Sequence, residues 1–79
     1  MMSATHDAVY ANITLIEQRL RRALALAVEA RAAMSERKHN LAIGTLLPMQ
    51  EDLTDVNALL TTIFVLHRQA AHPEPRGAA

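Results

Sequence analysis

Three side chains of the types that bind metal ions lie near the middle of the chain: Glu36, His39 and Glu51. Glu36 and His39 have the Glu-x-x-His spacing with which helical bundles hold iron between facing helices. Glu51 comes near them if the chain turns back on itself between residues 38 and 40. Glu36 and His39, however, fall outside the apolar stripe of the expected helix. We therefore expect a solvated cluster of charges at a helix end, with no bound metal and no cofactor.

Arginine side chains offer a second kind of chemistry, the binding of nucleic-acid phosphates. Arg19 and Arg22 are three residues apart, and Arg31 lies further along the same expected helix, so a dimer would present two basic strips. Glu17 and Glu29 interrupt the strip, and a single Tyr and a single Phe leave almost no platform for stacking bases. Nucleic-acid binding is therefore an alternative, behind solvation of these arginines or their pairing with acidic residues of the second half.

Catalysis by a nucleophile needs Ser, Thr or Cys beside a His in a cleft. The chain has no cysteine, and two helices offer little concavity. His67 lies on an apolar stripe, where it could form a pH-sensitive contact near Asn12. The favoured interpretation is an end residue with one edge in water. We expect no enzymatic activity.

Length and charge set further bounds. A chain of 79 residues forms one domain at most, and so small a core is hard to stabilise without a partner. Eight basic and eight acidic residues argue against a general polyanion binder. Up to Asn40 there are six basic and four acidic residues, whereas residues 41–71 hold one basic and three acidic. The two halves therefore have opposite net charge and could attract each other weakly.

Targeting signals are not apparent in the sequence. The first ten residues do not show a cationic segment followed by an apolar one, as a secretory signal would. The apolar runs are well short of the roughly 20 residues that span a bilayer. We expect a cytoplasmic protein without membrane association.

Apolar residues in the first half recur at alternating spacings of four and three, which predicts a long helix over about residues 6–38 that packs lengthwise on another helix. Four further apolar residues lie beside this seam and widen the apolar surface: Leu15, Leu24, Leu26 and Val28. The seam consists of Val9, Ile13, Ile16, Leu20, Ala23, Ala27, Ala30 and Met34.

A second seam predicts a helix over about residues 41–71, with Asn40 as its N-cap. The same register continues backwards past Pro48, so we expect the helix to run through this proline with a kink near Gly44 and Pro48. The alternative ends helix 1 at Ile43, with Gly44 as its cap, and starts helix 2 at Pro48. We expect residues 72–79 to be a disordered tail. The second seam consists of Ala42, Leu46, Met49, Leu53, Val56, Leu60, Ile63, His67 and Ala70.

Residues 1–71 are thus predicted to form an all-α antiparallel two-helix hairpin. A turn near residues 39 and 40 would place Ala27 opposite Asp52 or Leu53, and Ile16 opposite Ile63. A lone hairpin leaves apolar side chains exposed, and dimerisation into a four-helix bundle would cover them. The predicted interface comprises Val9, Ile13, Leu15, Ile16, Leu20, Ala23, Leu26, Ala27, Leu53, Val56, Leu59, Leu60, Ile63, Phe64 and Leu66.

The favoured function is a small non-enzymatic protein–protein interaction or regulatory module that self-associates. Its partner is a second copy or another helical protein, and nucleic acid is less expected. In size and layout the chain resembles small two-helix co-chaperones of secretion systems. That resemblance implies a helical chaperone or adaptor whose apolar face binds a helix of another protein. The layout is also similar to Rop-like hairpin dimers, which implies RNA binding through Arg19, Arg22 and Arg31.

Overall fold

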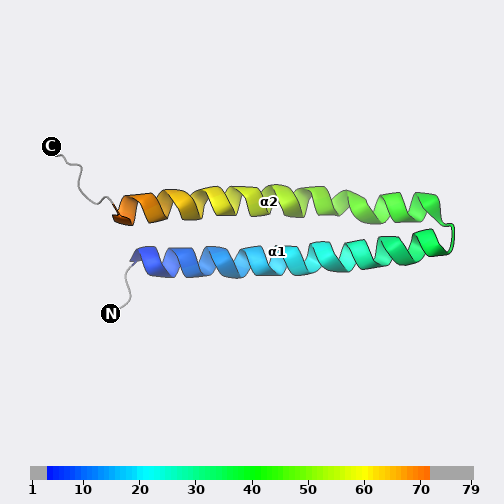
Figure 1. Cartoon of the computed structure of the whole chain (residues 1–79), viewed down its shortest axis with the longest axis horizontal. Coiled ribbons are helices and arrows are strands. Elements are labelled where there is room, and N and C mark those ends of the chain that lie inside the picture. The colour runs from blue at the N-terminus through cyan, green and yellow to red at the C-terminus, as the bar shows by residue number, and fades with distance from the viewer. Residues whose placement is uncertain (1–3, 72–79) are drawn as a thin grey trace.

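The computed structural model describes residues 4–71 and consists of two antiparallel helices joined by a short turn (Figure 1). Helix α1 spans Ala4–Ser35 and helix α2 spans His39–Ala71. At 1.5 Å per residue each helix is about 50 Å long. The predicted all-α hairpin is confirmed. The tail predicted for residues 72–79 lies outside the described residues.

The turn comes earlier than predicted, because α1 ends at Ser35 and residues 36–38 reverse the chain. Arg37 adopts the left-handed conformation with φ of 61°. The Lys38 amide donates to the Ala33 carbonyl at 2.9 Å, and the Arg37 amide donates to the Met34 carbonyl at 2.9 Å. This pair of bonds is the Schellman arrangement that closes a helix C-terminus.

The N-cap predicted for α2 was wrong. The Lys38 carbonyl accepts the first bond of the helix from the Ala42 amide at 3.0 Å, and Asn40 already lies in the first turn of α2. The turn was misplaced because the rules for helix ends look for Gly or Asn in the left-handed position, and this chain uses an arginine there.

Helix α2 runs through Pro48 without a break, so the alternative in which a helix starts at Pro48 was wrong (Figure 1). Proline inside a helix removes one backbone bond, and its ring crowds the carbonyl four residues earlier. That earlier residue is Gly44, whose Cβ position faces open space. The backbone adjustment that Pro48 requires is therefore made at Gly44, and glycine has the widest range of backbone conformations.

The residues of each helix that contact the other helix alternate at spacings of three and four, as predicted. However, every second residue of each predicted seam is replaced in the contact by the residue just before it. Asn12 and Arg19 occupy the contact in place of Ile13 and Leu20, which are 53% and 46% exposed. On α2, Asp52 takes the place of Leu53. The contact residues of α1 are Val9, Asn12, Ile16, Arg19, Ala23, Leu26, Ala30 and Ala33. Those of α2 are Ala42, Thr45, Met49, Asp52, Val56, Leu59, Ile63 and Leu66.

The register of the hairpin also differs from the predicted one. Arg22, not Ala27, lies against Asp52, which is a shift of more than one helical turn along α1. The shift follows from the turn, because centring the reversal on residue 37 instead of 39 or 40 moves every facing pair toward the N-terminus of α1.

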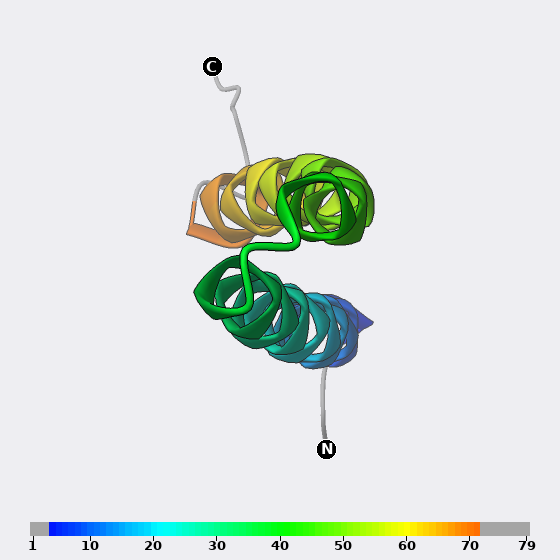
Figure 2. The ribbon, with the colours of Figure 1, turned by 90° about the vertical axis from the view of Figure 1, so that its right-hand side faces the viewer.

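The hairpin is a single layer with little interior. Its shortest dimension is 13 Å, close to the diameter of one helix with its side chains. Figure 2 views the layer end-on, with the two helices beside each other. The buried hydrophobic residues within 4–71 are all small or medium-sized, and none is a Leu, Ile, Met or Phe. They are Ala23, Ala30, Ala33, Ala42 and Val56.

Candidate interaction surface

One side of the hairpin carries four charged residues that pair between the helices. Arg22 Nε lies 3.1 Å from Asp52 Oδ2, and Arg19 Nε lies 3.6 Å from Asp55 Oδ2. We call Arg19, Arg22, Asp52 and Asp55 the charged flank. It confirms the attraction expected between the basic first half and the acidic second half.

Asp52 is the one buried charged residue in the part of the chain that the structure describes, with an exposed fraction of 1%. Although Arg22 Nε is close, its N–H is not aligned with Oδ2, which accepts no hydrogen bond from the described residues. The contact is therefore an electrostatic pair. Burial of a carboxylate without a partner is costly, so Asp52 depends on the half-exposed guanidinium of Arg22.

The opposite side of the hairpin is apolar. Both helices are right-handed and they run in opposite directions. The residue that directly follows a contact residue therefore points to the same side of the pair on α1 and on α2. Nine of these positions hold large apolar residues, and four others hold Glu17, Arg31, Gln50 and Asn57. We call the nine apolar residues the apolar flank: Ile13, Leu20, Leu24 and Met34 of α1, with Ile43, Leu46, Leu53, Leu60 and Phe64 of α2.

Most of the apolar flank is open to solvent. Exposed fractions are 65% for Leu24, 55% for Phe64 and 45% for Leu53, while Leu46 and Leu60 are half-buried. Large apolar side chains arranged in a continuous stripe on a small protein mark a surface that binds another molecule.

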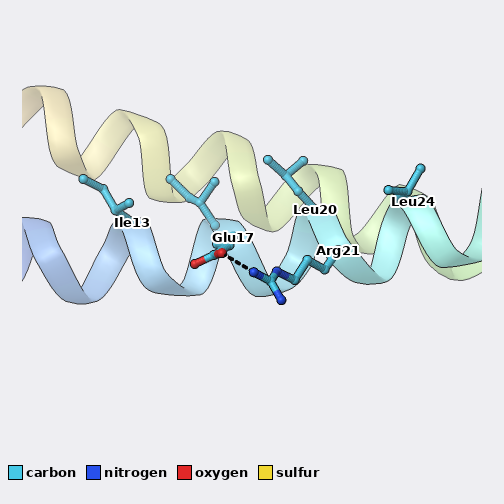
Figure 3. Close-up of a pocket in the computed structure, with 6 residues that line it drawn as sticks. Ile13, Glu17, Leu20, Arg21 and Leu24 are labelled. Carbon is cyan, nitrogen blue, oxygen red and sulfur yellow. Dashed lines mark hydrogen bonds and ion pairs between the residues drawn. The ribbon is translucent and has the colours of Figure 1, made fainter.

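A shallow groove of about 370 Å³ runs along the α1 part of the apolar flank. Figure 3 shows Ile13, Leu20 and Leu24 projecting to one side of α1, with the ion pair between Arg21 and Glu17 along the edge. All the lining residues, which also include Ile16, belong to α1. Because no second element closes the groove, it cannot enclose a small molecule as binding pockets do. Its length and apolar lining suit the side chains of another helix.

The predicted interface residues divide into two groups. Those packed at least partly within the hairpin are Val9, Ile16, Ala23, Leu26, Val56, Leu59, Leu60, Ile63 and Leu66. Those left exposed are Ile13, Leu15, Leu20, Ala27, Leu53 and Phe64. Apart from Leu15 and Ala27, the exposed group belongs to the apolar flank. Leu24 was expected to widen the apolar surface but was left out of the predicted interface, although it lies four residues after Leu20 on the same side of α1.

The candidate metal ligands are not brought together. Glu36 pairs with Lys38 at 2.8 Å in the turn, and both His39 and Glu51 are exposed on α2. Within residues 4–71 there is no group of three or more His, Cys, Asp or Glu side chains placed to hold a metal ion.

Two of the three arginines considered for nucleic-acid binding are engaged with carboxylates. Arg19 and Arg22 form the charged flank, and a phosphate would have to displace Asp55 and Asp52. Arg31 makes no ion pair with any described residue, so the predicted basic strip is reduced to one free arginine. His67 lies exposed beside the contact, and not in it as predicted.

Comparison with known proteins adds no relationship: no family model, curated protein or solved structure matches this chain. Among the described residues, neither helix contains a stretch long and apolar enough to cross a membrane.

Proposed function

We propose that this chain is a non-enzymatic protein–protein interaction module, and that it self-associates through the apolar flank to form a four-helix bundle. The observation that supports the proposal is the division of the hairpin into a charged flank, whose residues form ion pairs within the chain, and an apolar flank that is mostly exposed.

The one-layer architecture supports the same proposal. Stable domains pack at least two layers of secondary structure around one core. This hairpin has one layer, and the core cluster of buried residues is three alanines with Leu46 packed against them. A second layer laid on the apolar flank would turn the exposed leucines into a core.

The size of the flank is suited to a stable dimer. A face about 50 Å long and two helices wide, at about 10 Å between axes, offers roughly 1,000 Å². Specific interfaces bury about 800 Å² on each partner. The hairpin can therefore supply its half of an ordinary interface without further elements.

The experiment compares two identical substitutions on α2 by analytical ultracentrifugation. Leu53→Glu places a charge on the apolar flank, whereas Leu47→Glu places it at an exposed position that lies on neither flank. We expect Leu53→Glu to abolish self-association at micromolar concentration, because burial of an unpaired carboxylate costs several kcal/mol. Leu47→Glu should associate like the unmodified chain.

The same comparison on α1 uses Leu20→Glu and Val28→Glu, whose side chains are 46% and 55% exposed. Equal behaviour of the flank variants and their controls would overturn the proposal. A chain that stays monomeric before any substitution would point instead to an adaptor whose apolar flank binds another protein.

A further inference from the structure

Two charged residues border the apolar flank of α1 in a self-complementary pattern. Glu17 and Arg31 are the charged residues at the rotational position of Leu24, seven residues before and after it. The corresponding position on α2 holds Gln50 and Asn57, so the α2 part of the flank is uncharged there. The acidic residue is nearer the start of α1 and the basic residue is nearer its end.

Arg31 has no ion-pair partner among the described residues, although its side chain lies beside an apolar surface. Glu17 is bound to Arg21 at 2.6 Å but has a side chain 58% exposed, so a carboxylate oxygen remains open to a second cation. Both side chains border the surface that a partner would cover.

Building on the proposed self-association, we infer that the second copy packs with its α1 antiparallel to α1 of the first, so that Glu17 of each copy faces Arg31 of the other and the two turns lie at opposite ends. A two-fold axis makes each contact occur twice, because residue i meets residue j and residue j meets residue i. Antiparallel α1 helices bring the acidic start of one against the basic end of the other.

The competing arrangement places α1 of one copy against α2 of the other, with both turns at one end. It leaves Glu17 facing the Asn57 position and Arg31 facing the Ile43 position, both of which are uncharged. The charges would then be partly removed from water without a counter-charge, which is unfavourable. Charge complementarity therefore favours the dimer in which the two turns lie at opposite ends.

The first test exchanges charges between two variants, Glu17→Arg and Arg31→Glu. Each variant alone places like charges at both contacts of its own dimer, and the dissociation constant should rise by about threefold to tenfold. An equimolar mixture places opposite charges at both contacts, so mixed dimers should form in excess of the statistical half. The matched control is Glu29→Arg, which changes the charge of α1 by the same amount away from the apolar flank and should leave the dissociation constant unchanged.

The second test measures where the turns lie. The chain has no cysteine, so Ser35→Cys gives one site per chain for a nitroxide label. In the proposed register Ser35 of one copy faces residue 13 of the other, so turns at opposite ends place the two labelled positions about 35 Å apart by pulsed electron paramagnetic resonance. Turns at one end place them within about 25 Å.

The short label distance, or a statistical mixture of the two charge variants, would overturn the arrangement while leaving the proposed self-association intact. The absence of any intermolecular distance from a monomeric chain would overturn both. The mass of the labelled chain separates these outcomes.

Discussion

Residues of the charged flank decide how the two helices face each other. Asp52 is buried where a leucine would ordinarily sit, and its charge is compensated by one guanidinium at 3.1 Å. The contact holds Arg22 against one turn of α2, since any other register would leave the carboxylate buried and alone. A buried ion pair of this kind adds little net stability and instead favours one arrangement over others.

This view predicts unequal effects for two neighbouring arginines. Arg22→Ala should lower the free energy of unfolding by about 1 to 3 kcal/mol, because it strands the Asp52 carboxylate. Arg21→Ala removes an exposed pair with Glu17 and should cost only a few tenths of a kcal/mol. Urea denaturation at fixed protein concentration measures both values.

Replacing the carboxylate itself completes the argument. In the Arg22→Ala chain, Asp52→Leu should restore the lost stability, because a buried charge is exchanged for an apolar side chain of similar size. Equal losses from Arg21→Ala and Arg22→Ala, or no recovery with Asp52→Leu, would show that Asp52 does not depend on Arg22.

At the scale of the helices, Pro48 is the main local defect. It lies within α2, nine residues after the helix begins at His39. Pro48→Ala should raise the free energy of unfolding by about 1 to 3 kcal/mol, by restoring a backbone hydrogen bond and removing the clash with the Gly44 carbonyl. Chemical denaturation measures the change, and a loss of stability would argue that α2 is not continuous through this residue.

The sequence predicted the two helices well and their relative rotation poorly. Periodicity was strong enough to indicate continuity through Pro48, where capping rules alone allowed a break. The rotation was wrong because the most apolar stripe was assigned to the contact within the chain. The polar residues Asn12, Arg19 and Asp52 occupy that contact instead. Charged residues can lie there because Arg19 and Arg22 form ion pairs with the aspartates of α2.

The apolar flank was predicted only in part, because the predicted rotation of the helices was wrong. Phe64 was predicted to lie exposed beside the seam, and the structure leaves it exposed. Ile13, Leu20 and Leu53 were assigned to the seams and are exposed instead. Their arrangement on one side of the hairpin required the rotation, which apolar periodicity cannot fix. The opposite net charge of the two halves was the one sequence feature that indicated this rotation. The individual ion pairs could not be assigned from it, because that requires the position of the turn.

At the scale of the whole molecule, the hairpin has two long helices and only a small hydrophobic core. Its helices bury five small or medium-sized hydrophobic residues between them, while nine large ones form a flank that is mostly exposed. Long isolated helices gain most of their stability from packing of an apolar face. The central claim is therefore that folding and self-association of this chain are coupled.

The most direct test is the thermal midpoint of helix melting by circular dichroism across a hundredfold range of concentration, with the mass of the same samples from light scattering. Coupled folding and association predict that the midpoint rises with concentration and that the helical species has twice the mass of the chain. A helical monomer whose melting midpoint does not change with concentration would contradict the account.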